Sequence, residues 1–349
     1  MADEARKNVI VVGAGASAEF RLPTGAELVK RIEGALSFRD VMEGGMHPSS
    51  GDYLVHRAIS NLSVQIGVSS HQLFEKARRI KENMSLAPSI DNFLDTHRSD
   101  KALVAVGKLV IANEILKAER GSLLKIKEGN IYNRMRFDNL QETWVSVFFK
   151  LIVAKRDFQN FKDAIKNITF ISFNYDRCIK YFFVNAAISY FDLDGQQASE
   201  LLAEIRVIHP YGNVGDMHME GLQTIGFGPE VDPAGLVEIS SRIRTFTEGV
   251  SDDGVASEIQ KSFQDAEVVI FLGFSFIDIN MEILRPDAPF ARRVLATTKG
   301  RSKDTQARLF DEISRDYIDK RFRPVVDLFD GKCFELFYAF DHFLMNAQK

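Results

Sequence analysis

The stretch Val9-Ile10-Val11-Val12-Gly13-Ala14-Gly15-Ala16-Ser17-Ala18 indicates the fold. Its run of β-branched residues predicts a strand that is buried on both faces. Gly13, Gly15 and Ala18 then fit the Gly-x-Gly-x-x-Gly/Ala pattern of a strand–turn–helix phosphate loop, in which Gly13 forms the turn and Gly15 lets the backbone approach a pyrophosphate. Because free N–H groups at a helix start favour an anion, the stretch predicts nucleotide binding. The alternative is a tight turn that binds nothing.

The composition is that of an ordinary globular chain. It has 349 residues, enough for one large domain or two, and is 45% hydrophobic and 26% charged. A net charge of −4 gives no general argument for nucleic acid, and no direct nucleic-acid site is evident. Cys178 and Cys333 alone form neither a disulfide framework nor a four-cysteine zinc site, which fits a reducing cytoplasm. We expect no signal peptide, and no membrane span because the longest apolar run, near 145–154, is short and contains Lys150.

Strands that alternate with helices predict a parallel sheet with helices on both faces. After the first strand, the expected strands are residues 168–173, 206–208, 268–272, 293–297 and 334–338. Residues 38–60 are polar and are expected to form a loop, whereas residues 61–165 show helical periodicity and no convincing strand. The sequence therefore predicts an α/β fold, a doubly wound Rossmann-like sheet formed by residues 1–36 and 166–349. Residues 37–165 are expected to be an inserted helical module.

Residues with useful chemistry follow several of these strands directly. In doubly wound sheets ligands bind beyond the carboxyl ends of the strands, where Gly13, Asn174, His209 and Gly273 all fall. Asn174 suits a ribose hydroxyl or a water, and Asp176 suits a hydroxyl or a carboxamide, although both also suit an Asx turn that caps the next helix. His209 suits general-base work, and its alternative is a structural role.

Three further polar residues stand near predicted helix starts. Thr24 is expected to cap a helix, with Glu27 at the capping-box position. Asp91, in Ser89-Ile90-Asp91-Asn92-Phe93-Leu94, has a helix cap as its alternative role. Ser275 follows the strand at 268–272, where its hydroxyl suits a phosphate or a ribose. The remaining histidines form no pair at metal-ligand spacing, so no metal is expected.

Taken together, these motifs resemble the sirtuin-like family. Gly13-Ala14-Gly15-Ala16-Ser17 is similar to its Gly-Ala-Gly-x-Ser loop, and Ser172-Phe173-Asn174-Tyr175-Asp176 is similar to its Thr-Gln-Asn-Ile-Asp motif at the Asn and the Asp. His209 stands where the family's catalytic His would stand. Gly273-Phe274-Ser275 is similar to the Gly-x-Ser that contacts the adenosine half of NAD. The resemblance covers about residues 8–35 and 167–340.

Departures from the deacetylating sirtuins indicate which branch of the sirtuin-like family this sequence resembles. Those enzymes carry two paired-cysteine zinc-ribbon motifs, which two lone cysteines cannot supply. Leu22-Pro23-Thr24-Gly25 and the element Ser89–Leu94 resemble instead the bacterial sirtuin-like domains of anti-phage defence systems, which hydrolyse NAD. His209-Pro210 also departs from the family's usual His-Gly.

The resemblance implies an NAD+ glycohydrolase that releases nicotinamide and ADP-ribose. It places the pyrophosphate on the loop 13–17, the nicotinamide carboxamide on Asp176, and the ribose and the attacking water on Asn174, with His209 as the base. The full set of cofactor-binding residues that it implies is Gly13, Ala14, Gly15, Ser17, Thr24, Asp91, Asp176, Gly273 and Ser275.

The same resemblance implies a biological setting. By this resemblance, the chain would be a cytoplasmic, NAD-depleting effector of anti-phage defence that forms a homo-oligomer and works with a HerA-type ATPase partner. Two alternatives stay open. One is a catalytically silent NAD- or ADP-ribose-sensing or assembly subunit, favoured if Pro210 displaces His209. The other is an NAD-dependent protein deacylase.

Overall fold

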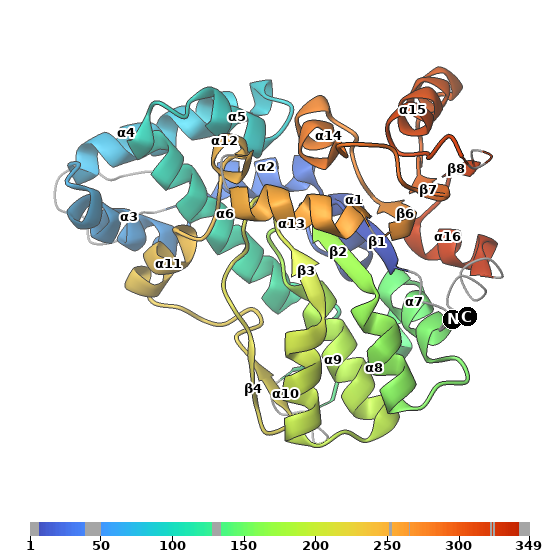
Figure 1. The fold of residues 1–349 in the computed structure, drawn as a ribbon. Coiled ribbons are helices and arrows are strands. Elements are labelled where there is room, and N and C mark those ends of the chain that lie inside the picture. The colour runs from blue at the N-terminus through green and yellow to red at the C-terminus, as the bar shows by residue number, and fades with distance from the viewer. Residues whose placement is uncertain are drawn as a thin grey trace.

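The central feature of the structure, a computed structural model, is a parallel sheet whose strand order is β3-β2-β1-β6-β7-β8 (Figure 1). The structure describes residues 7–38, 50–127, 134–250, 253–264, 266–321, 323 and 325–341. Strand order reverses between β1 and β6, which is where doubly wound folds bind ligands. The predicted Rossmann-like α/β fold is therefore confirmed. The strands are β1 (Lys7–Val12), β2 (Ile168–Ser172), β3 (Arg206–Ile208), β6 (Ala266–Leu272), β7 (Arg293–Thr297) and β8 (Val325–Phe329).

β1 is central because its side chains serve two hydrophobic cores. Val9 and Val11 belong to the core on one face of the sheet, and Ile10 and Val12 belong to the core on the other. Parallel neighbours on both sides, β2 and β6, satisfy its backbone. A strand with no polar face needs an apolar residue at every position, and this explains the β-branched run.

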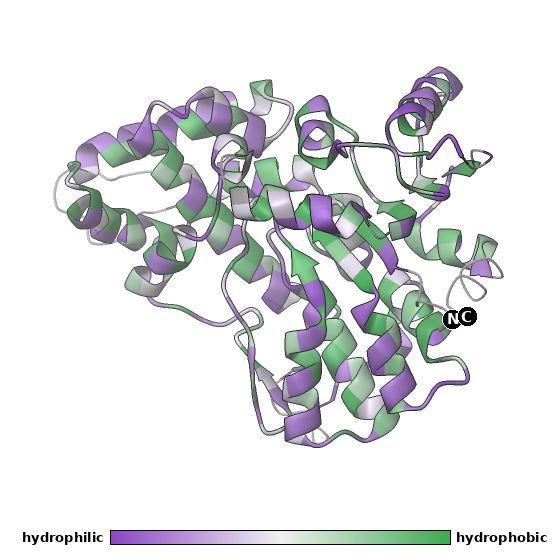
Figure 2. Ribbon diagram, in the orientation of Figure 1, coloured by the Kyte–Doolittle hydropathy of each residue, from purple (hydrophilic) through white to green (hydrophobic). Residues whose placement is uncertain are grey.

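Helices cover both faces of the sheet. Those packed in the core of Val9 are α2 (Gly25–Ala35), α3 (Tyr53–Ile66), α4 (Ser70–Asn83), α5 (Ile90–Thr96), α6 (Lys101–Gly121), α11 (Pro233–Ser240), α13 (Asp253–Gln264), α14 (Asp278–Leu284) and α15 (Lys303–Asp316). Those packed in the core of Ile10 are α7 (Trp144–Val153), α8 (Phe158–Lys166), α9 (Cys178–Phe191), α10 (Gly195–Glu204) and α16 (Cys333–Ala339). Figure 2 shows hydrophobic residues along the strands and hydrophilic residues over much of α4 and α15.

Short elements complete the description. Helix α1 (Ala14–Ser17) and the 3₁₀ turn η1 (Ala18–Phe20) follow β1, and a small antiparallel hairpin is formed by β4 (His218–Glu220) and β5 (Gln223–Ile225). The others are η2 (Met84–Leu86), η3 (Phe137–Leu140) and α12 (Phe246–Val250).

Two predicted elements are wrong. The strand expected at 334–338 is helix α16, because Cys333, Leu336 and Phe337 are the buried positions and their spacing is helical. The last strand is instead β8, whose Asp327 pairs with Arg293 on β7. The loop expected over 38–60 contains the start of α3, which Asp52 caps, and residues 39–49 of that loop lie outside the described residues.

The helices of residues 37–165 pack into both cores of the sheet. Helices α3 to α6 join the core of Val9, and α7 and α8 join the core of Ile10. Trp144 of α7 lies close to Phe170 of β2 and Phe337 of α16, at ring-centroid distances of 6.2 and 6.4 Å. The domain boundaries at 36/37 and 165/166 stay a prediction.

Candidate functional site

The loops after β1 and β6 touch backbone to backbone at the switch point of the sheet. The N–H of Gly13 donates to Leu272 O at 2.9 Å, and that of Gly15 donates to Gly273 O at 3.0 Å. Gly273 has a φ of +54°, and a Cβ there would lie 2.7 Å from the Cα of Gly15. A Cβ at Gly15 would lie 2.9 Å from the Cα of Gly273. Glycine is therefore required on both sides of this contact.

The expected reason for glycine at position 13 is wrong. Gly13 has a φ of −111° and is extended, so it does not form a turn closed to other residues. A Cβ there would instead lie 2.6 Å from Gly273 O, so the contact between the two loops requires the glycine. Ala14 directly follows Gly13 and begins the four-residue helix α1.

Ser17 links the first loop to the loop after β2. Its hydroxyl donates to Asp176 Oδ2 at 2.9 Å and accepts from Asn174 Nδ2 at 2.8 Å. Ser17 is only 3% exposed, so its hydroxyl faces inward. Asp176 Oδ1 accepts the N–H of Cys178 at 3.0 Å, as in the Asx turn that was the alternative role. Burial raises the pKa of this carboxyl.

Asn174 has one polar atom left for a ligand. Its Nδ2 donates to Gly13 O at 3.0 Å as well as to Ser17, so both amide hydrogens are used. Among the residues that the structure describes, none donates to its Oδ1. The side chain is partly exposed. An oriented acceptor of this kind suits a ribose hydroxyl or a water.

His209 is held in one tautomer. Its Nδ1 lies 2.9 Å from the backbone oxygen of Asn174, and a carbonyl only accepts, so Nδ1 carries the proton and Nε2 keeps its lone pair. Desolvation lowers the pKa of His209 to about 4, with a smaller contribution from the positive charges of Lys180 and Arg177. The imidazole is therefore neutral at pH 7. Pro210 does not prevent the contact with Asn174.

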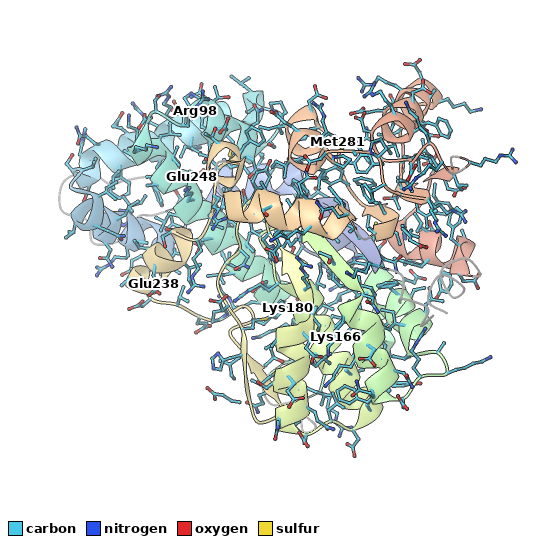
Figure 3. All side chains as sticks on the ribbon, in the orientation of Figure 1. Arg98, Lys166, Lys180, Glu238, Glu248 and Met281 are labelled. Atoms are coloured by element: carbon cyan, nitrogen blue, oxygen red, sulfur yellow. The ribbon has the colours of Figure 1, made fainter. Side chains whose placement is uncertain are left out.

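His209 and Asp176 line a cavity of about 210 Å³. Lys180 of α9, labelled in Figure 3, lines it too, and desolvation lowers the pKa of its ammonium group. Arg177, another lining residue, forms a buried ion pair with Glu119 of α6 and approaches the backbone oxygens of Gly215 and Asp216 at 3.4 Å. We call this space the histidine cavity.

A larger cavity of about 580 Å³ lies at the glycine contact. Its lining includes Gly15 after β1, Gly273 after β6, and residues that follow β7 and β8. Three of these are basic, namely Lys299, Arg301 and Lys332. We call this space the basic cavity. Helix α1 is connected to both cavities, since its Gly15 lines the basic one and its Ser17 is bonded to Asp176 of the histidine one.

Glu19 is a lining residue of the basic cavity that the sequence analysis missed. Its carboxylate accepts the backbone N–H of Trp144 at 2.7 Å and that of Phe334 at 3.2 Å, and so joins α7 to α16. Burial raises its pKa to about 7, against these hydrogen bonds, which lower it. No local pattern marks Glu19, because its partners are distant in sequence. The same is true of the Glu119–Arg177 pair.

The other predicted binding residues, Thr24, Asp91 and Ser275, differ in how close they lie to the two cavities. Thr24 caps α2 in a capping box with Glu27, and it lines neither cavity. Asp91 accepts a hydrogen bond from the hydroxyl of Tyr175, the neighbour of Asn174, while Ser89 caps α5. Ser275 is exposed, and its backbone oxygen accepts from Arg301 of the basic cavity.

Comparisons with known proteins add no family. A scan against family models and a search of curated proteins each found no match. Within the described ranges, no group of three His, Cys, Asp or Glu residues is placed to hold a metal ion. In the same part of the chain, no helix has the length and apolar character needed to cross a membrane.

Proposed function

We propose that this chain hydrolyses the N-glycosidic bond of NAD+. The observation that supports this most is the neutral His209, which lines one cavity, beside a second cavity that Gly15 of the loop 13–17 lines together with three cations. The histidine cavity also contains Lys180 and Arg177, and Arg177 is paired with Glu119. A dinucleotide has this division: an anionic adenosine diphosphate half and a nicotinamide riboside half. The pyrophosphate would lie beside Gly15 of the loop 13–17, with nicotinamide riboside in the histidine cavity and adenosine in the basic cavity.

The reaction would run with water as nucleophile. The C1′–N bond breaks, its electron pair neutralises the pyridinium ring, and nicotinamide leaves from an oxocarbenium-like sugar. Water then bonds to C1′ and gives a proton to Nε2 of His209, while Oδ1 of Asn174 accepts from the ribose or the water. The products are nicotinamide, ADP-ribose and one proton.

A base with a low pKa suits this order of events. Water that bonds to a nearly free oxocarbenium ion becomes acidic as the bond forms, so a weak base is sufficient. His209, with a pKa lowered to about 4, is unprotonated throughout the neutral range. Its hydrogen bond to Asn174 O also keeps Nε2 as the basic nitrogen.

The experiment that tests the proposal is a product assay. NAD+ is incubated with the purified chain, and nicotinamide and ADP-ribose are separated and quantified. Asn174→Ala should lose turnover because it removes Oδ1. Asn213→Ala is the control, since Asn213 lines the histidine cavity and its Oδ1 accepts the N–H of Gly215 in its own loop. NAD+ binding without release would favour the silent sensor instead, and release by Asn174→Ala at the wild-type rate would refute the mechanism.

We further propose that the chain is the cytoplasmic NAD-depleting effector of an anti-phage defence system. The support is the resemblance of Leu22–Gly25 and Ser89–Leu94 to such proteins. A toxic NADase needs restraint, which homo-oligomerisation or a HerA-type ATPase would provide. Mass measurement of the purified chain tests self-association, and a strict monomer at micromolar concentration would count against it.

A further inference from the structure

The cations of the basic cavity come from a different part of the sheet edge than the loop 13–17. Lys299 and Arg301 follow β7, and Lys332 follows β8. In the sheet order β1-β6-β7-β8, these strands are the second and third from β1. At a strand spacing of about 4.8 Å, the cations belong to strands roughly 10 to 14 Å from β1. A pyrophosphate at the N-terminus of α1 leaves them for another group.

The three cations differ in how firmly they are held. Arg301 donates to Ser275 O, and its guanidinium carbon lies 5.4 Å from the ring centre of Phe276. Lys332 has its Nζ 5.4 Å from the ring centre of Phe334. Lys299 is exposed and has neither a hydrogen bond nor an ion pair with any residue in the described ranges. Two exposed ammonium groups thus lie beside an ordered guanidinium, and that of Lys332 also interacts electrostatically with Glu19.

The acidic residues of the cavity do not cancel this charge. Among the residues that the structure describes, the acidic ones that line it are Glu19 and Glu142. Glu19 is bonded to the N–H groups of Trp144 and Phe334, and with a pKa of about 7 it is partly neutral at physiological pH. Glu142 is exposed. The cavity therefore has a net positive charge at neutral pH.

We propose that the basic cavity binds an adenosine whose ribose carries an additional phosphate, so that the preferred dinucleotide is 2′-phosphorylated, as in NADP+. This rests on the proposed function for the direction in which the dinucleotide lies. Dinucleotide folds select an unmodified ribose with an acidic side chain and a 2′-phosphate with a basic one. Here the segment after β7 supplies Lys299 and Arg301, and Lys332 comes from the segment after β8.

Product binding tests this without requiring catalysis. Calorimetry would compare ADP-ribose with 2′-phospho-ADP-ribose on the full chain. We expect the wild type to bind the phosphorylated ligand at least about tenfold more tightly, because a charge-assisted phosphate contact is typically that strong. Lys299→Ala combined with Lys332→Ala should bring the two affinities together. Lys303→Ala is the control, since Lys303 is exposed on α15 and does not line the cavity.

The outcomes separate this inference from the proposed activity. Equal affinity of the wild type for both ligands, or a preference that survives the double substitution, would overturn the inference even if NAD+ is cleaved. A preference that the double substitution removes supports it even if no nicotinamide is released, in which case the glycohydrolase proposal alone fails. Binding of neither ligand would overturn it as well.

Discussion

The backbone oxygen of Asn174 lies 2.9 Å from Nδ1 of His209, and this contact joins the carboxyl ends of β2 and β3. It sets the tautomer of the imidazole with a main-chain atom, which substitution of the Asn174 side chain does not remove. The same residue bonds Gly13 and Ser17 through its Nδ2. Asn174 therefore connects the loops after β1, β2 and β3.

The pH profile of turnover should reflect the lowered pKa of His209. The base is active when neutral, and its pKa is about 4, below the ordinary 6.5, because of desolvation. We expect kcat/KM to stay level from pH 8 to about 5.5 and to fall only as the pH approaches 4. Measurement of kcat/KM across this range checks this. An acid limb centred near the ordinary histidine value would show that His209 is not the desolvated base described above.

Gly273→Ala should destabilise the protein. The added Cβ would meet the backbone of Gly15 and Ala16, at a φ of +54° that alanine adopts only with strain. Strain and overpacking together should lower the free energy of unfolding by about 2–5 kcal/mol. Gly34→Ala is the control, because Gly34 is exposed within α2 with nothing near the added atom, and it should gain up to about 1 kcal/mol. Equal effects in denaturant titrations would refute the loop contact.

Glu19→Gln should change how stability depends on pH. Burial raises the folded-state pKa of Glu19 to about 7, above the unfolded value of 4.5, so the folded state binds more protons between these values. Wild-type stability from this group is then present at low pH and lost as the pH rises towards 7, by about 3 kcal/mol. Glu19→Gln should lack this decline between pH 5 and 8, and Glu142→Gln should keep it. Parallel curves for wild type and Glu19→Gln would contradict the assignment.

Glu119→Ala should be among the most destabilising single changes. Glu119 is fully buried and accepts the backbone N–H groups of Arg177 and Gly228, at 2.9 and 2.8 Å, besides pairing with the Arg177 guanidinium. Removing it leaves a buried charge unpaired, which costs about 3–5 kcal/mol. Glu220→Ala, at an exposed pair with His218, should stay within about 0.5 kcal/mol of wild type. A loss below about 1 kcal/mol for Glu119→Ala would mean that Arg177 finds another partner.

The sheet could be predicted where strands are buried on both faces. β1, β2, β6 and β7 are short apolar runs followed by polar or glycine residues, and periodicity with length is enough to identify them. The last strand was predicted at 334–338 instead of at β8. The segment Phe334–Tyr338 has apolar residues at positions that fit both the strand period of two and the helical period of 3.6. Only its packing against α7 decides for the helix.

The candidate site could be predicted only in part. Asn174 and His209 were found because polar residues at strand ends meet at one sheet edge, and the structure brings them into contact. The basic cavity could not be predicted from the sequence. Its residues follow different strands, and only the order β6-β7-β8 in the sheet brings them together. Glu19 bonds Trp144 and Phe334, 125 and 315 positions away, so no local pattern could show it.

The measurement that tests the central claim most directly is nicotinamide release from NAD+ by wild type and His209→Ala. The matched control is His218→Ala, whose imidazole is exposed on β4 and contacts only Glu220 among the interactions assigned to it. We expect the wild type and His218→Ala to release nicotinamide and ADP-ribose in equal amounts, and His209→Ala to be slower by about 100-fold or more. Release by His209→Ala at the wild-type rate would contradict the account.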